Sequence, residues 1–345
     1  LLRARTGRTH VVLTGRGATA IWATLRALDL HDQPILIPAN TCYIVLWAIL
    51  HSGNQPYLAD IDPLTGNVTA QTLDQSGVRP AVIIPAHMYG IPAPLTAISA
   101  WARENGAFVM EDAALTVPTL TSASDATIYS FGREKIIDAD GGGALVTDDA
   151  RLAAEVERAL ADLPVWNDRL EKLNQQWLQL YWPLHLFEGE TPRLSELYPT
   201  LFDLYGTITR ARLRDWSNLR GALASLDASL ALRRELADRY DRRFASTPVR
   251  RLMRPSNTVL WRYPILVPSD LRDHLLEFLW SEGVLGATRW YPSLQPMRRA
   301  LASDLPTTPT PDADQFAAQI INLPLAPATT HADVDRAATF VLDAL

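Results

Sequence analysis

The stretch ATIYSFGREKIIDADGGGALVTDD, residues 126–149, places a single lysine between an apolar, strand-like run and three consecutive glycines. A lysine that leaves a buried strand and precedes a glycine-rich turn can lie at the bottom of a cleft. Burial there favours the neutral amine, which attacks carbonyl groups to form a Schiff base. The same spacing also suits a solvated lysine in a surface loop. The role of Lys135 therefore depends on the segments around this stretch.

The region before this stretch alternates short apolar runs with helical patterns, which is typical of parallel strands joined by crossover helices. We expect strands in residues 11–17, 34–39, 55–62, 81–90, 107–114, 126–131 and 143–149. Helices are expected between them in residues 18–30, 41–53 and 93–106, the last ending at an Asn-Gly stop signal. The sequence therefore predicts a large α/β domain with a mostly parallel sheet.

The region after this stretch becomes helical and then returns to mixed structure. Residues 151–210 carry large aromatic side chains, for which packing is favoured over direct substrate contact: Trp166, Trp177, Tyr181, Trp182, Phe187 and Tyr198. Beyond them we expect a long helix at 212–244, a strand at 259–268, a helix at 269–283 capped by Ser269, a loop at 305–315 and a closing helix at 331–345. We therefore predict a large domain, residues 1–210, that includes the helical segment, and a smaller C-terminal α+β domain, residues 211–345.

The composition narrows the class of protein. With 345 residues and 48% hydrophobic content, the chain can bury a large core. A net charge of -6 without a long basic run disfavours a nucleic-acid partner. Cys42 is the only cysteine, which excludes an internal disulfide framework and a cysteine-rich zinc site and suits a reducing compartment. No apolar run reaches membrane-spanning length. We expect a soluble cytoplasmic protein without a metal, nucleic-acid or membrane partner.

Two other segments support chemistry at Lys135. Residues 107–114, AFVMEDAA, end an apolar run with Glu111 and Asp112, which places a carboxylate at the edge of the sheet where α/β proteins build their sites. Such a carboxylate can pair with the pyridinium nitrogen of pyridoxal 5'-phosphate (PLP). Residues 14–20, TGRGATA, open a helix with small residues, so free N–H groups and the helix dipole can receive a phosphate. This order of phosphate cradle, acid and lysine predicts a PLP enzyme of the aspartate-aminotransferase fold.

These segments belong to a set of motifs that covers nearly the whole chain in one order. The motifs are PILIPANTCYIVLWAILHSGNQPYLADIDPLTGNV (34–68), IIPAHMYGIPAPLTAI (83–98), MEDAA (110–114), YSFGREK (129–135), RRELADRY (233–240), WRYPILV (261–267), RWYPSLQPM (289–297) and INLPLAP (321–327). In this order the sequence resembles the DegT/DnrJ/StrS family of PLP-dependent sugar aminotransferases. The resemblance implies fold type I, with a large mostly parallel sheet domain, a smaller C-terminal domain and a homodimer.

The resemblance also implies a role for each matching residue. Lys135 lies at the position of the Schiff-base lysine, which also moves protons at the substrate carbon, and Asp112 lies where the family pairs an acid with the pyridine nitrogen. The other implied contacts are phosphate binding by Gly17, Ala18, Thr19 and Ser130, a place beside the cofactor for His87, stacking on its ring by Tyr43 in preference to Cys42, and a substrate contact from Tyr291. For His87 and Tyr291, a packing role remains an alternative.

Three departures from the family pattern concern the site. Leu115 stands where the family has a polar residue, and Gly141 stands where its glycine turn carries an acid. The Asn that reaches the phosphate from the partner subunit has no counterpart in residues 206–216, GTITRARLRDW. Arg210 or Arg212 could replace it, because a guanidinium also pairs with phosphate.

The resemblance therefore implies an aminotransferase that moves an amino group from an amino-acid donor to a keto sugar, nucleotide-linked by expectation, or to a cyclitol. One alternative is a PLP- or PMP-dependent sugar dehydratase, although those relatives replace the lysine with histidine and this chain keeps Lys135. The other is a non-catalytic binding or regulatory protein, which the changes at Leu115 and Gly141 suggest.

Overall fold

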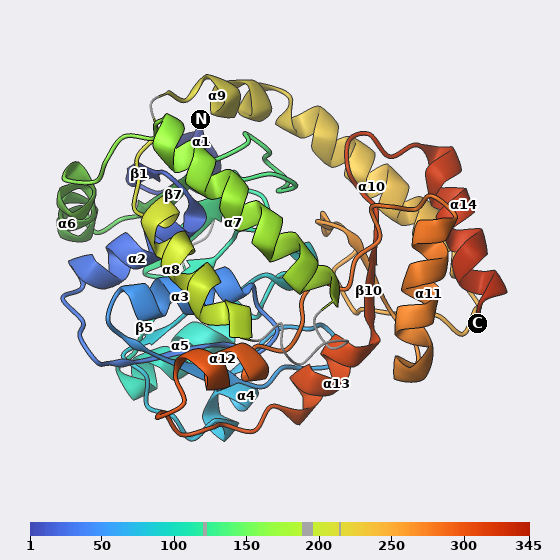
Figure 1. Ribbon diagram of the computed structural model, residues 1–345, viewed down its shortest axis with the longest axis horizontal. Coiled ribbons are helices and arrows are strands. Elements are labelled where there is room, and N and C mark those ends of the chain that lie inside the picture. The colour runs from blue at the N-terminus through green and yellow to red at the C-terminus, as the bar shows by residue number, and fades with distance from the viewer. Residues whose placement is uncertain (120–122, 188–195, 214) are drawn as a thin grey trace.

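The computed structural model describes residues 1–119, 123–187, 196–213 and 215–345. Figure 1 shows a larger body that contains the first half of the chain and a smaller body near the C-terminus. The side chains of Trp182 and Phe187, two of the predicted aromatic residues, lie outside the description. Among the helices that the structure describes, none has the length and apolar character needed to cross a membrane.

The larger body is built on a seven-stranded sheet, and each predicted strand contributes to it. In spatial order its strands are β1 (His10–Thr14), β7 (Gly143–Thr147), β6 (Ala126–Ser130), β5 (Phe108–Asp112), β4 (Val82–Ile83), β2 (Pro34–Pro38) and β3 (Gln55–Ala59). The strands β3, β2, β4, β5 and β6 pair in parallel. Their residues are buried or nearly so, as expected for a parallel sheet covered on both faces.

Strand β7 is the exception, because it runs antiparallel to both neighbours. A parallel pair needs a crossover connection, usually a helix, and residues 131–142 between β6 and β7 contain turns and bends but no helix. That connection is the Lys135 stretch itself. The prediction of a mostly parallel sheet is therefore confirmed, with the exception at the strand that follows the lysine.

Helices cover this sheet, and the first turn of one of them, α2 (Gly17–Ala27), lies beside strand β7, which follows the Lys135 stretch. They are α1 (Leu2–Thr6), α2 (Gly17–Ala27), α3 (Tyr43–His51), α4 (Ala70–Gln75), the 3-10 turn η1 (Met88–Gly90), α5 (Leu95–Asn105) and α6 (Ala150–Ala161). As predicted, α5 ends at Asn105, and Gly106 follows in the left-handed conformation with φ 68°. A Cβ on Gly143 would lie 2.4 Å from the backbone carbon of Arg16, so glycine allows β7 to touch the start of α2.

Two aromatic-rich helices, α7 (Asp168–Phe187) and α8 (Tyr198–Thr209), pack against each other and cross the larger body, as Figure 1 shows. Trp47 of α3 meets Trp177 of α7 at 6.2 Å and Tyr205 of α8 at 5.4 Å between ring centroids. The Trp177 and Tyr181 rings pack at a tilt, with their centroids 4.3 Å apart. These aromatic contacts hold α7 and α8 against α3. The packing role that the sequence predicts for the aromatic residues is therefore present.

The smaller body contains a three-stranded antiparallel sheet in the order β10-β9-β8. The elements after residue 216 are α9 (Ser217–Ala224), α10 (Leu226–Arg243), β8 (Arg250–Arg251), β9 (Tyr263–Leu266), α11 (Ser269–Ser281), α12 (Gln295–Leu301), α13 (Pro311–Gln319), β10 (Ile320–Leu323) and α14 (His331–Asp343). Of these, α12 packs on α8 of the larger body. Helices α10, α11 and α14 gather on the three-stranded sheet, as the yellow to red part of Figure 1 shows.

Three predictions for this region are wrong in detail. The expected helix at 212–244 is two helices, α9 and α10, which meet at Ser225. Pro268 precedes α11, and Ser269 makes no side-chain cap. The Pro-rich loop contains the start of α13, because Pro311 suits the first turn of a helix.

The chain from Leu294 to Thr308, which includes α12, lies against the larger body. The Leu294 N–H donates to the Ala39 carbonyl at 2.8 Å, and the Thr308 hydroxyl donates to the Leu58 carbonyl at 2.5 Å. The division of the chain at residue 210 stays a prediction.

Candidate active site

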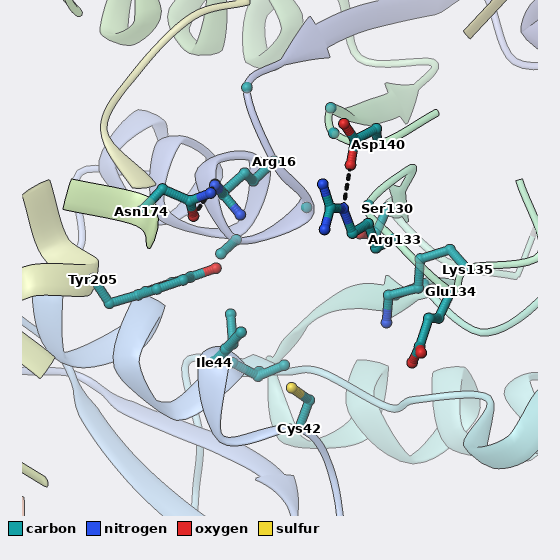
Figure 2. A pocket seen from close by; sticks show the side chains of 18 of the residues that line it. Arg16, Cys42, Ile44, Ser130, Arg133, Glu134, Lys135, Asp140, Asn174 and Tyr205 are labelled. Atoms are coloured by element: carbon teal, nitrogen blue, oxygen red, sulfur yellow. Dashed lines mark hydrogen bonds and ion pairs between the residues drawn. The ribbon is translucent and has the colours of Figure 1, made fainter. Parts of the chain in front are cut away.

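A cavity of about 510 Å³ opens between the ends of β5 and β6, the first turn of α2, helix α7 and the segments around Trp261 and Tyr291. Ligand sites of α/β proteins form at the carboxyl ends of parallel strands. Figure 2 shows this cavity with the Lys135 side chain reaching into it from one side. Of the predicted site residues, the cavity is lined by Gly17, Ala18, Asp112, Ser130, Lys135 and Tyr291.

Lys135 lies in the β6–β7 connection, and its loop is fixed from two sides. Its own N–H donates to the Gly132 carbonyl at 3.2 Å, and the preceding residue, Glu134, adopts a positive φ of 64°. Two side chains from the smaller body hold Glu134. The Trp261 indole N–H donates to the Glu134 carbonyl, and Arg262 forms an ion pair with the Glu134 carboxylate at 3.0 Å. The loop that presents the lysine is therefore attached to both bodies.

Asp112 ends β5 with its carboxylate facing the same cavity. Its Oδ1 accepts the Ala114 N–H at 2.9 Å, and its side chain is 7% exposed. Burial raises the pKa of Asp112, and the Ala114 hydrogen bond and the Lys135 charge oppose this rise. A cationic ligand atom that met this carboxylate would favour its ionised form.

Glu111 and His87 form a separate polar network beside Asp112. The His87 Nε2 meets Glu111 Oε1 at 2.7 Å, and its Nδ1 accepts the Ala93 N–H at 2.9 Å. The second Glu111 oxygen accepts the hydroxyls of Ser124 and Thr127, each at 2.7 Å. Burial alone would raise the pKa of Glu111, but these hydrogen bonds outweigh it and lower the pKa. His87 does not line the cavity, and the structure places it as a packed, hydrogen-bonded histidine.

The first turn of α2 and Ser130 form a cradle at one end of the cavity. A Cβ on Gly17 would lie 2.9 Å from the Ser130 Cβ and 3.3 Å from its hydroxyl oxygen, so glycine keeps this space open. The Ser130 hydroxyl makes no hydrogen bond within the part of the chain that the structure describes. Thr19 lies elsewhere, because its side chain is fully buried and its hydroxyl donates to the Thr209 carbonyl at 2.5 Å. The cradle therefore consists of Gly17, Ala18 and Ser130.

The predicted preference for Tyr43 over Cys42 at the cofactor ring is not favoured by the geometry. The Tyr43 ring packs between Trp47 and Tyr181, at 5.2 and 5.3 Å, and does not line the cavity. The reason is helical register: Cys42 precedes α3 and faces the cavity, whereas Tyr43 begins the helix and faces its neighbours. Figure 2 shows the Cys42 thiol below the space between Lys135 and the cradle. Burial raises the pKa of this thiol.

Neither arginine proposed for the phosphate reaches this cavity within the chain. The Arg210 Nε donates to the Gly206 carbonyl at 2.8 Å, and the Arg212 Nε donates to the Leu163 carbonyl at 3.0 Å. Both side chains are exposed, and neither lines the cavity. A contact from either to a partner subunit's site stays a prediction.

Tyr291 lies in an aromatic lining with Trp261 and Trp290. Its ring stacks on Trp261 at 5.9 Å and is 2% exposed. Burial raises the pKa of Tyr291, so its hydroxyl stays protonated. Tyr291 lines the cavity, and the substrate contact implied for it stays a prediction.

A second side of the cavity was not predicted. We call it the helical wall; it consists of Asn174, Trp177 and Tyr181 of α7 and Tyr205 of α8. The three α7 residues follow helical spacing, so one face of α7 looks into the cavity. The sequence predicts packing for Trp177 and Tyr181, and in the structure both rings pack and also line the cavity.

The sequence has two lysines, Lys135 and Lys172, so few residues compete for the role of Schiff-base lysine. Lys172 is exposed on α7, and it does not line the cavity. A carbonyl ligand in this cavity therefore has Lys135 as its one lysine partner within this chain.

The two changed family positions have different consequences. Leu115 is buried in the core and is 6% exposed, outside the cavity lining. Gly141 lines the cavity, and the atoms nearest to an added Cβ are the methyl groups of Leu213, at 4.0 Å. Among the described residues, no cluster of His, Cys, Asp and Glu is suited to a metal ion.

Comparisons with known proteins agree with this geometry. The sequence profile of the DegT/DnrJ/EryC1/StrS aminotransferase family matches residues 1–342. The structure of DesI, described in the presence of its TDP-sugar product, is 22% identical, with a TM-score of 0.75 over 99% of this chain and 81% of DesI. Helicobacter pylori PseC, an aminotransferase of pseudoaminic acid biosynthesis, is 19% identical, with a TM-score of 0.74 over 99% of this chain and 88% of PseC. The structure of 3-amino-5-hydroxybenzoic acid synthase is 19% identical, with a TM-score of 0.73 over 99% and 88%.

Proposed function

Since the chain belongs to the DegT/DnrJ/EryC1/StrS aminotransferase family, we propose that it is a PLP-dependent enzyme acting on a keto sugar or a cyclitol. Its amino donor is an amino acid. The family match and the structural neighbours confirm the predicted family, the fold-type-I architecture and the class of enzyme, an aminotransferase. The cofactor, the acceptor and the site residues belong to the proposal.

One observation carries the proposal: Lys135, Asp112 and the Gly17–Ser130 cradle open into a single cavity. These groups come from three separate segments of the chain, and each matches a different part of PLP. The cradle offers N–H groups and a free hydroxyl to a phosphate. Asp112 offers a carboxylate to a protonated ring nitrogen, and Lys135 offers an amine to the aldehyde. The residues present therefore fit this cofactor.

PLP supplies an electron sink for the electrons released when a proton leaves the amino-acid carbon. The residues of the chain do the remaining work. Asp112 keeps the ring nitrogen protonated, since an ionised carboxylate stabilises the adjacent positive charge. The Lys135 amine would accept the proton from the donor carbon and would return a proton to the acceptor carbon. The aromatic lining around Tyr291 excludes water from this proton transfer.

The nature of the acceptor is supported by the lining and by the neighbours. Trp261, Trp290 and Tyr291 offer aromatic faces that suit the C–H faces of a sugar or cyclitol ring. DesI is described with a TDP-sugar product and PseC with pseudoaminic acid biosynthesis. We accordingly place the acceptor among keto sugars, nucleotide-linked by analogy with DesI, with a cyclitol as the second choice.

The assembly and location complete the proposal. We infer a homodimer, supported by the family resemblance, and its test is the mass of the protein in solution by sedimentation. Location in the cytoplasm is supported by the use of a single cysteine, Cys42.

The test of the proposed function is the visible absorbance of the purified protein after addition of PLP. A lysine-bound cofactor absorbs well above the protein band, and borohydride reduction should fix it on the peptide that contains Lys135. Bleaching by glutamate or glutamine should follow if the protein transaminates. A protein that remains colourless with PLP would contradict the proposal and favour a non-catalytic binding protein.

A further inference from the structure

The proposed cradle for the cofactor phosphate consists of neutral groups. It consists of Gly17 and Ala18, in the first turn of α2, and of Ser130. A phosphate monoester carries close to two negative charges at neutral pH. Neutral donors and a helix dipole compensate only part of this charge, so a cation near the cradle is expected.

Three cations line the cavity: Arg16, Arg133 and Lys135. The proposed function already uses Lys135. The Arg133 side chain is 71% exposed and forms an ion pair with Asp140 at 2.5 Å. Arg16 is half-buried and has no carboxylate partner in the described part of the chain. Its charge is therefore available to an anionic ligand.

Arg16 is also held in place beside the cradle. It immediately precedes Gly17 and is the N-cap residue of α2. Its guanidinium donates to the Asn174 Oδ1 at 2.8 Å, and its Cζ lies 5.1 Å from the centre of the Trp166 ring. Its Nε is buried without a hydrogen-bond partner. An amide and an aromatic face orient a guanidinium without neutralising it.

The Tyr205 hydroxyl also responds to the Arg16 charge. Its ring is 2% exposed, and Figure 2 shows its hydroxyl pointing into the cavity toward the first turn of α2. Burial raises the pKa of Tyr205, and the Arg16 charge is the largest effect that opposes this rise. Arg16 therefore lies close enough to the Tyr205 hydroxyl to act on it, and both residues line the cavity.

We propose that Arg16, oriented by Asn174 and Trp166, supplies within the same chain the cation that pairs with the cofactor phosphate. This inference rests on the proposed function, because the phosphate is that of PLP. It differs from a contact by Arg210 or Arg212 across a dimer interface, since neither of these side chains lines the cavity of its own chain. Helix α7 contributes Asn174 to this arrangement, so the helical wall completes the phosphate site.

The test compares PLP with pyridoxal, which has the same ring and aldehyde but no phosphate. Cofactor-free wild type, Arg16→Gln, Arg133→Gln, Arg210→Gln and Arg212→Gln are each titrated with both compounds, and the absorbance of the lysine-bound form gives the affinities. Arg16→Gln should weaken PLP binding about 10- to 100-fold, the usual value of a hydrogen bond to a charged group. Its affinity for pyridoxal should match that of wild type. Equal losses for both compounds would mean that Arg16 only supports the fold, and would overturn the inference.

A second variant keeps the inference testable if Arg16→Gln folds poorly. Asn174→Ala removes the amide that orients Arg16, and it should cause a smaller loss that is again confined to PLP. A phosphate-selective loss in Arg133→Gln, Arg210→Gln or Arg212→Gln, with Arg16→Gln unchanged, would assign the phosphate to another arginine. A wild-type chain that binds pyridoxal as tightly as PLP would overturn this inference alone. A wild-type chain that binds neither would overturn the proposed function with it.

Discussion

The two sides of the cavity differ in how the chain builds them. We call the first the sheet floor; it consists of Asp112, Ser130 and Lys135, at the ends of β5 and β6 and in the loop that follows. The second is the helical wall on α7 and α8. The floor is formed by residues close in sequence to their strands, whereas the wall depends on two helices that pack through aromatic rings. On this fold, the residues expected to carry out the chemistry lie at strand ends. The shape of the cavity depends instead on how distant helices pack.

The largest expected effect concerns the floor. Lys135→Ala should abolish the borohydride-fixed cofactor and reduce transamination by about 10⁴-fold, the upper range for loss of a proton-transfer group. Mass spectrometry of the reduced protein and half-reaction rates measure the two effects. The matched control is Lys172→Ala, which removes the exposed lysine and should change neither. Fixation of the cofactor on Lys172 in the Lys135→Ala protein would show that the floor has been misassigned.

The second effect separates chemistry from binding on the same floor. Asp112→Asn should lower the half-reaction rate about 10²- to 10³-fold, because it removes a charge that stabilises the transition state. Its effect on PLP affinity should be much smaller, since the cradle and Arg16 hold the phosphate. Stopped-flow rates and absorbance titration give the two numbers. A rate close to that of wild type would remove Asp112 from the site.

The third effect tests the wall. Trp177 is 3% exposed and its ring packs against Tyr181 and Tyr205, so Trp177→Ala should lower the free energy of unfolding by about 3–5 kcal/mol. It should also raise the KM for substrate, because the ring lines the cavity. Chemical denaturation and steady-state rates measure both.

The control for the wall is Trp101→Ala. Trp101 is 9% exposed on α5, outside the cavity lining. This variant should be destabilised with an unchanged KM. If both variants change KM alike, the wall acts only through the stability of the fold.

Much of the floor could be predicted from the sequence. The strands, the acid at the end of β5 and the lysine after β6 follow from local patterns of apolar residues and turns. The sequence could not show which of two adjacent residues at a helix start faces the cavity. One position decides whether Cys42 or Tyr43 faces the cavity, and Thr19 lies one residue beyond the cradle. Arg16 was missed because nothing local shows that Asn174, far along the chain, will meet it.

The smallest effect concerns two adjacent carboxylates on β5. Asp112 belongs to the sheet floor, whereas Glu111 belongs to a hydrogen-bond network outside the cavity lining. The pKa of Asp112 is raised in the folded chain, mainly by burial. Without cofactor, the folded protein therefore keeps the Asp112 proton to higher pH than the unfolded chain does. Stability should fall as the pH rises from the ordinary Asp range through the folded pKa. Asp112→Asn should remove this loss and stabilise the cofactor-free protein at neutral pH by about 1 kcal/mol.

Glu111 should behave in the opposite way. Its pKa is lowered in the folded chain by His87, Thr127 and Ser124, which outweigh burial. Its contribution to stability is complete above the ordinary Glu range and is lost as the pH falls through the folded pKa. Glu111→Gln should therefore destabilise the protein at neutral pH by about 1–3 kcal/mol, because the network loses a charged acceptor. Thermal melts of both cofactor-free variants between pH 4 and 8 measure these changes. Shifts of the same sign in the two variants would mean that Asp112, like Glu111, is held by the fold rather than kept ready for a ligand.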